Sequence, residues 1–304
     1  MDRCILCPRE CGADRALGKT GWCGSGAHIR AARAALLYYE EPCICPEAGS
    51  GAVFFTGCSL GCVFCQNIEI ASGRKGNEGL AVTPERLCEI FFSLQDQGAA
   101  NINLVTGGHF IHEIIPSLKL AKERGLRIPV VYNTSSYERP EIIRALEGLV
   151  DIWLPDLKFC SPELSLRYCR AADYFDRAFA AIREMVRQCP EPVFDSGEDS
   201  LMKSGVIVRH MVMPGHTEDS KKIIRCLCET FGDSIYISIM NQYTPMPQAA
   251  GDPLLGRPVS EKEYDEVVDF AIDIGVENGF IQEGGTVSDS FIPSFDGTGI
   301  RKIP

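Results

Sequence analysis

The sequence predicts an α/β fold built on a mostly parallel sheet. From Gly51 onward, short apolar runs alternate with segments of helical period, which is the pattern of βα units. The apolar runs are nearly continuous, as expected of strands that are buried on both faces. Six or seven such units are too few for a closed eight-stranded barrel, so a partial barrel is expected.

The units divide the chain into three parts. Strands are expected at 52–56, 101–106, 128–133, 151–154, 206–212, 235–240 and 279–281. Helical spacing of i, i+3, i+4 and i+7 is clearest at Leu87, Ile90, Phe91 and Leu94, and again at Tyr264, Val267, Val268 and Ala271. We therefore expect a cysteine-rich N-terminal unit (1–42), a barrel (43–285) and a C-terminal extension (286–304) that packs across the barrel.

Composition narrows the class of protein. The chain has 304 residues, 45% of them hydrophobic, and a net charge of −11. This acidic balance, with a pI near 5.0, argues against a nucleic-acid partner. No apolar run approaches the ~20 residues of a membrane span, and the N-terminus lacks the apolar core of a signal peptide. Fifteen cysteines in such a chain indicate metal binding more than disulfides, in a cytoplasmic protein from an anaerobic setting.

The most specific motif follows the first expected strand. Cys58, Cys62 and Cys65 are separated by three and then two residues. Three thiolates can ligate three irons of a cubane 4Fe-4S cluster, which leaves the fourth iron open to a small molecule. The alternative is a zinc site, although tetrahedral zinc sites usually take their ligands as two separated pairs.

This motif, with Phe64 just before the last cysteine, resembles the signature of the radical S-adenosylmethionine (SAM) superfamily. The resemblance implies a (β/α)6 partial barrel and a 4Fe-4S cluster held by Cys58, Cys62 and Cys65. It also implies SAM on the open iron, with the backbone of Phe64 facing the adenine. An electron from a donor such as flavodoxin or ferredoxin then cleaves SAM to a 5'-deoxyadenosyl radical, which abstracts hydrogen from the substrate.

Two later strand ends also resemble SAM-contacting elements of this superfamily. Gly107 and Gly108 stand where the family often has Gly-Gly-Glu, whose backbone and side chain meet the methionyl amino group; His109 replaces the acid here, and its role is open. Asp156 and Lys158 resemble the Asp-x-Lys element of glycyl-radical-enzyme activases, which lies near the methionine part of SAM. A structural ion pair is the alternative for these two residues.

Arg209 and His210 interrupt another apolar strand, and buried charges require partners. They resemble an Arg-His-x-x-x-Pro-Gly segment of the same activases, with the histidine near the SAM ribose. His210 is therefore a candidate SAM contact. A hydrogen-bonded core histidine is the alternative.

A second group of cysteines precedes the barrel. Cys4, Cys7, Cys11 and Cys23 are joined by tight turns, so four thiolates can converge where a hydrophobic core cannot form. Their spacing predicts a second metal site and suits either zinc or an iron-sulfur cluster. We assign no role to the other two early cysteines, Cys43 and Cys45, because no partner ligands are evident.

The chain as a whole resembles pyruvate formate-lyase activating-enzyme-like proteins from about residue 42 to 283. It lacks the two extra cysteine clusters of ferredoxin-bearing activases, since only Cys88 lies between Cys65 and Asn101. The first hypothesis is therefore an enzyme that abstracts hydrogen from a glycyl residue of a partner glycyl radical enzyme. The second is a radical SAM enzyme acting on a small molecule or a peptide side chain. A non-catalytic iron-sulfur or zinc protein is disfavoured by the open cluster motif.

Overall fold

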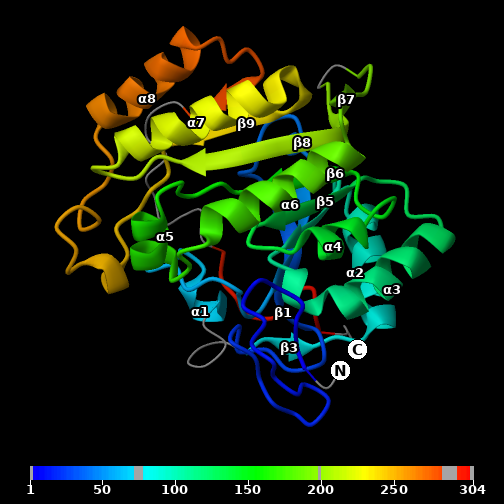
Figure 1. The fold of residues 1–304 in the computed structure, drawn as a ribbon. Helices are drawn as coiled ribbons and strands as arrows, with labels where there is room; N and C mark the ends of the chain where they lie inside the picture. The colour runs from blue at the N-terminus through cyan, green and yellow to red at the C-terminus, as the bar shows by residue number, and fades with distance from the viewer. Residues whose placement is uncertain (1–2, 72–77, 198–199, 283–292, 302–304) are drawn as a thin grey trace.

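A computed structural model describes residues 3–71, 78–197, 200–282 and 293–301. Its centre is one curved sheet (Figure 1). In spatial order the strands are β10 (Gly279–Ile281), β9 (Tyr236–Met240), β8 (Met202–Met211), β6 (Ile152–Pro155), β5 (Val130–Thr134), β4 (Ile102–Val105), β2 (Ser50–Phe55), β1 (Arg30–Leu37) and β3 (Leu80–Ala81); β7 (Val193–Phe194) pairs with β8 off this path. From β2 to β10 all neighbours along this path are parallel. The predicted α/β fold with a partial, TIM-like barrel is confirmed.

Each strand expected from the sequence is present, with bounds that differ by a few residues. The largest difference is in β8, which begins at Met202 instead of Val206. The extra residues pair antiparallel with β7, where Val193 lies opposite Ser204. A hairpin contact therefore extends this strand beyond its parallel part.

Strand β1 was not expected. Its sequence is rich in alanine, a strong helix former, but Ala31, Ala32 and Ala34 are buried in the sheet, where β1 pairs antiparallel with β2. The unit predicted at 1–42 thus contributes a strand to the barrel sheet. Residues 293–301 also lie along β1, where the amide of Ala34 donates to the carbonyl of Thr298 over 2.8 Å.

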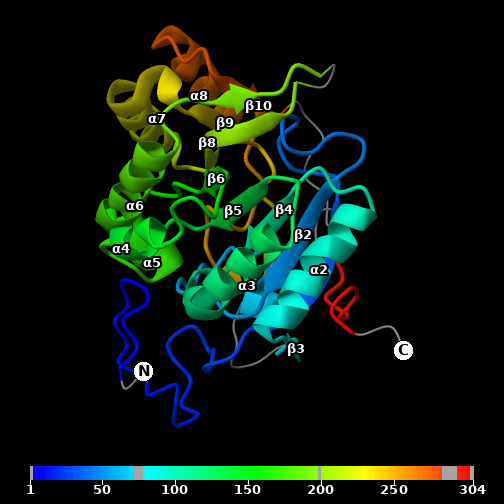
Figure 2. The same ribbon diagram turned by 90° about the vertical axis from the view of Figure 1, so that its right-hand side faces the viewer.

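Helices cover the outer face of the sheet (Figure 2). They are α1 (Ile68–Ala71), α2 (Pro84–Asp96), α3 (Ile111–Glu123), α4 (Pro140–Arg144), α5 (Pro162–Cys169), α6 (Tyr174–Gln188), α7 (Thr217–Phe231) and α8 (Glu261–Asp273), with short 3-10 turns at Gly108–Phe110, Gly232–Ser234 and Pro247–Ala249. The apolar stripe predicted for α2 is buried. In α8, Ser260 and Glu263 form a reciprocal capping box that fixes the first turn. Across the described residues, no helix combines the length and the apolar character needed to cross a bilayer.

The loop after β1 closes the amino end of the barrel. Ile44 and Cys43 pack with Val131, Ile152, Leu154, Met202 and Ile207, which come from β5, β6 and β8. The carbonyl of Cys43 accepts a hydrogen bond from the amide of Met202 over 2.8 Å. Because side chains alternate along a strand, the next residues on the same face of β5, β6 and β8 point into the barrel at the carboxyl end. This leaves a polar interior there, above an apolar floor.

Candidate active site

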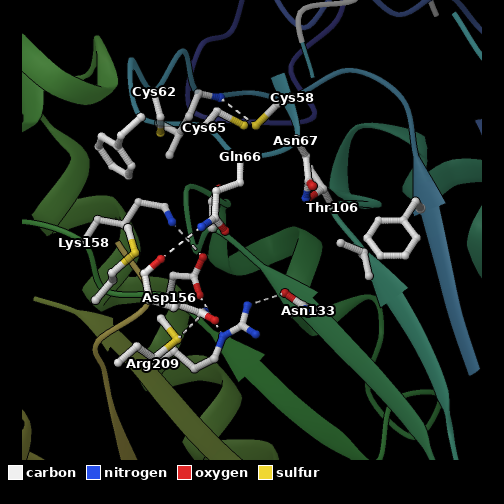
Figure 3. A pocket seen from close by; sticks show the side chains of 18 of the residues that line it. Cys58, Cys62, Cys65, Gln66, Asn67, Thr106, Asn133, Asp156, Lys158 and Arg209 are labelled. Atoms are coloured by element: carbon white, nitrogen blue, oxygen red, sulfur yellow. Dashed lines mark hydrogen bonds and ion pairs between the residues drawn. The ribbon is translucent and has the colours of Figure 1, made fainter. Parts of the chain in front are cut away.

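A cavity of about 240 Å³ opens at the carboxyl end of the parallel strands. The loop after β2 contributes Cys58, Cys62 and Cys65 to its lining, and β6 leads into Asp156 and Lys158 on the other side (Figure 3). The predicted cysteines and the predicted ion pair therefore face the same space. Phe64 also lines it.

The loop that carries the three cysteines, residues 57–67, is here called the cluster loop. Helix α5 supports it, because the amides of Gly61 and Val63 donate to the carbonyls of Cys169 and Tyr168 over 3.3 and 2.9 Å. Gly57 has a φ of +85°, and a Cβ on it would lie 2.6 Å from the carbonyl oxygen of Cys23. Glycine is thus required where the loop leaves β2.

The three thiols fit a cubane better than a single ion. In the described part of the chain, no three His, Cys, Asp or Glu side chains stand close enough to hold one metal ion, whereas a cubane takes each thiolate on a different iron. The amide of Leu60 donates to the sulfur of Cys58 over 3.4 Å. Burial raises the pKa of Cys58 above its usual range and that of Cys65 to about 12, so these sulfurs need a bound metal to persist as thiolates.

A charge network lies opposite the thiols. The ammonium of Lys158 is 2.7 Å from Asp156 Oδ2, and Arg209 Nε is 2.9 Å from Asp156 Oδ1. Arg209 also donates through Nη1 to Glu40 Oε2 over 3.0 Å and through Nη2 to Asn133 Oδ1 over 2.6 Å. Figure 3 shows Arg209 between Asp156 and Asn133. The four charged side chains are each less than one-fifth exposed.

Opposite charges keep most of this network ionised. Burial would raise the pKa of Asp156, but Lys158 and Arg209 outweigh burial and hold that pKa below its usual range. Burial would lower the pKa of Lys158, but Asp156 and Cys62 raise it above its usual range. Glu40 differs, because burial raises its pKa to about 7 in spite of Arg209. Asp156 and Lys158 thus present one negative and one positive charge to the cavity, as a zwitterionic ligand requires.

The predicted glycines lie beside this cavity and do not line it. A Cβ on Gly107 would approach Ile114 and Phe55, and a Cβ on Gly108 would meet the carboxylate of Glu138. Packing therefore explains why both positions lack a side chain, and their contact with SAM stays a prediction. Thr106, the residue before them, does line the cavity and has a φ of +59°, a strained conformation for a β-branched residue.

Both questioned histidines are buried away from the cavity. His109 Nε2 lies 2.7 Å from the carbonyl of Thr56, and burial lowers its pKa to about 4. His210 Nδ1 lies 2.7 Å from the carbonyl of Leu157, on the face of β8 opposite to Arg209. This placement favours the core-histidine alternative for His210 and puts its neighbour in the cavity instead.

The site also contains residues that sequence reasoning missed. Glu40, Asn133 and Arg209 line the cavity together. The signal for Arg209 was present, since side-chain alternation allows only one of two neighbouring strand residues to face inward. The four N-terminal cysteines are not among the residues that line the cavity.

A three-thiol loop with the radical SAM spacing, at the mouth of a partial parallel barrel and opposite a buried charge network, defines the class of a radical SAM enzyme. Residues 52–227, more than half of the chain, match the Radical SAM superfamily. The chain belongs to this superfamily. Membership implies a 4Fe-4S cluster and SAM; when bound and reduced, the cluster supplies the electron that cleaves SAM.

Similar proteins extend this result to most of the chain. The uncharacterized protein MJ0674 of Methanocaldococcus jannaschii is 28% identical over 237 residues, which cover 76% of this chain and 64% of that relative. The match thus spans a little under two thirds of the relative's length.

Two solved structures share the fold. The FeFe-hydrogenase maturase HydG of Carboxydothermus hydrogenoformans aligns with a TM-score of 0.51 at 12% identity, over 74% of this chain and 50% of that one. Streptococcus suis SuiB bound to its precursor peptide SuiA aligns with a TM-score of 0.50 at 13% identity, over 74% of this chain and 46% of that one.

Proposed function

We propose that the protein cleaves SAM reductively at a 4Fe-4S cluster held by Cys58, Cys62 and Cys65, and abstracts hydrogen from a substrate. The observation that supports this is the shared cavity of the three thiols and the Asp156–Lys158 pair. In this proposal Asp156 accepts a hydrogen bond from the amino group of SAM, and Lys158 contacts its carboxylate. Glu40 and Asn133 hold Arg209 against Asp156 and so fix the orientation of that carboxylate. A small one-electron donor such as flavodoxin or ferredoxin supplies the electron, in the cytoplasm.

The substrate we propose is a glycyl residue of a partner enzyme. This proposal is supported by the resemblance of Asp156-Leu157-Lys158 and Arg209-His210 to the corresponding segments of activases. A peptide side chain is the second candidate, because SuiB, which shares the fold, binds a precursor peptide. A small-molecule substrate belongs to the same second hypothesis.

Anaerobic reconstitution with iron, sulfide, SAM and dithionite tests the first step. We expect 5'-deoxyadenosine from the wild-type protein and none from Cys62→Ala. Electron paramagnetic resonance after turnover with candidate glycyl radical enzymes tests the substrate. A glycyl doublet supports the activase proposal, whereas SAM-dependent consumption of a peptide or metabolite without a doublet favours the second hypothesis.

A further inference from the structure

The first part of the chain has no regular secondary structure. The N-terminal segment, defined here as residues 3–28, contains neither helix nor strand. Glu10, Gly12, Gly18 and Gly24 have positive φ angles, so the backbone turns back on itself repeatedly. Its buried side chains are mostly thiols, namely Cys4, Cys7 and Cys23 beside Leu6 and Arg15. So small a core cannot order the segment by hydrophobic burial, which indicates a cross-link.

The sulfurs of this segment are surrounded as ligands usually are. Backbone amides donate hydrogen bonds to three of them, from Leu6 to Cys4, from Arg9 to Cys7, and from Ala13 and Trp22 to Cys11. In each case one donor lies two residues after the cysteine. The cluster loop repeats this arrangement, with Leu60 donating to Cys58 and Asn67 to Cys65. Such N–H···S bonds stabilise a thiolate and orient it toward a metal.

The fourth cysteine joins the same group. The sulfurs of Cys11 and Cys23 lie 3.1 and 3.6 Å from the point where a Cβ on Gly21 would stand. Cys4 and Cys11 are themselves hydrogen-bonded. A glycine at position 21 thus leaves room for sulfurs that come from opposite ends of the segment.

A buried cation gives an independent indication of negative charge. Arg15 is only 4% exposed, and its Nη2 donates to the sulfur of Cys23 over 3.3 Å. Its Nη1 donates to the carbonyl of His109 over 2.7 Å, and its Nε is buried without a hydrogen-bond partner in the described residues. A buried guanidinium is costly unless it is paired. Four thiolates around Zn²⁺, or around an oxidised 4Fe-4S cluster, carry two surplus negative charges and would meet this requirement.

We propose that Cys4, Cys7, Cys11 and Cys23 hold a second metal centre, either a zinc ion or an iron-sulfur cluster. Four thiolates close its coordination sphere, so this centre does not bind SAM and is structural or electron-relaying. It orders a segment that touches the cluster loop directly, because Gly57 packs against Cys23 and Arg9 Nε donates to the carbonyl of Ser59 over 2.9 Å. The centre is independent of SAM cleavage and remains if the proposed reaction proves wrong.

Metal analysis of a variant without the radical cluster tests this site. The Cys58→Ala/Cys62→Ala/Cys65→Ala protein, purified anaerobically, should keep one zinc, or iron and sulfide of one cluster, per chain. Adding Cys7→Ala and Cys23→Ala should remove it, whereas adding Cys226→Ala on α7 should not. Zinc with little iron identifies the ion, and iron with sulfide identifies the cluster. A folded triple variant that holds neither would overturn the proposal.

A second test needs no variant. Cys11 is the exposed member of the four, so a free thiol there would react promptly with iodoacetamide in the native protein. A metal-bound Cys11 should instead be protected and become reactive once a chelator is added, as peptide mass spectrometry would report. Equal alkylation of Cys11 with and without the chelator would contradict the proposal even if the variants failed to fold.

Discussion

Two cysteine regions of this chain use the same spacers in opposite order. The N-terminal segment has Cys4-x2-Cys7-x3-Cys11, and the cluster loop has Cys58-x3-Cys62-x2-Cys65. Both receive backbone N–H···S bonds from the residue two positions after a cysteine. They differ in what completes them, because the first has Cys23 as a fourth thiol and the second faces a cavity. The comparison teaches that spacing alone does not make a cysteine motif reactive; the missing fourth ligand and the adjoining cavity do.

The cations near the two regions are placed differently. Arg15 donates directly to the sulfur of Cys23 and is enclosed by protein. Lys158 is held by Asp156, and both reach the cavity opposite the cluster loop. In our proposals the first cation neutralises a closed centre, whereas the second belongs to a pair that binds a ligand.

The largest expected effect comes from the cluster loop. Cys62→Ala should abolish 5'-deoxyadenosine formation, because two thiolates do not hold the site-differentiated cubane that SAM requires. The product is measured by chromatography after anaerobic reconstitution, with Cys226→Ala as the matched control. Cys23→Ala should leave measurable product, since it alters the other region. Undiminished product from Cys62→Ala would end the distinction between the two regions.

The next effect concerns the charged pair in the cavity. Asp156→Asn and Lys158→Ala should each weaken SAM binding by about 1.5–3 kcal/mol, or roughly one to two decades in affinity, because each removes one charge-assisted contact. Anaerobic SAM titration measures the affinity, and the 4Fe-4S absorbance confirms that the cluster is intact. If both variants bind SAM as the wild type does, the pair is only a structural ion pair.

Much of the fold could be predicted from local pattern. The parallel strands are continuous apolar runs, so each was identified from its own residues. Strand β1 could not be, because Arg30–Leu37 is alanine-rich and becomes a strand through its pairing with β2. Tertiary context overrides helix propensity at this position.

The site was predicted where chemistry is local and missed where it depends on the path of the chain. Asp156 and Lys158 stand two apart at one strand end, so the sequence shows them as a pair. Glu40 follows a strand that was not expected, and only the loop that closes the amino end of the barrel brings it to Arg209. No sequence pattern links two residues so far apart, whereas alternation along β8 does separate Arg209 from His210.

A smaller effect tests the buried acid of the charge network. Because the pKa of Glu40 is raised to about 7, the folded protein holds this proton to higher pH than the unfolded chain. The resulting stabilisation is complete below the unfolded pKa and is lost as the pH rises through about 7, by up to roughly 3 kcal/mol. The groups that act on Glu40 are Arg209, Glu41 and Asp156.

Glu40→Gln should remove this component. We expect the wild-type free energy of unfolding, measured by urea denaturation, to fall relative to that of the variant between pH 5 and pH 8. Asp195→Asn is a suitable control, since Asp195 is a surface carboxylate whose pKa is lowered by Lys203. Parallel pH profiles for wild type and Glu40→Gln would show that Glu40 is ionised throughout this range.

The smallest effect tests whether the two cysteine regions are coupled. Arg9 is the main link between them, with hydrogen bonds to the carbonyls of Ser59 and Arg170 over 2.9 and 2.6 Å. Its guanidinium also lies over the rings of Trp22 and Tyr137, at 4.4 and 5.1 Å from the centroids. It is partly solvated, so its removal should cost about 1 kcal/mol, which corresponds to roughly fivefold in an equilibrium between a held and a loosened cluster loop.

Arg9→Ala should therefore lose iron from the reconstituted cluster several times faster in the presence of a ferrous chelator, followed by the decay of the 4Fe-4S absorbance. Arg9→Lys keeps the charge but not the planar fork, so its decay should fall between those of Arg9→Ala and the wild type. Protection of Cys11 from alkylation should be unchanged in both variants, because Arg9 contacts the cluster loop with its side chain and Cys7 only with its backbone amide. Identical decay in all three proteins would mean that the N-terminal segment and the cluster loop act independently. Loss of Cys11 protection together with faster decay would instead mean that Arg9 holds the N-terminal segment itself in place.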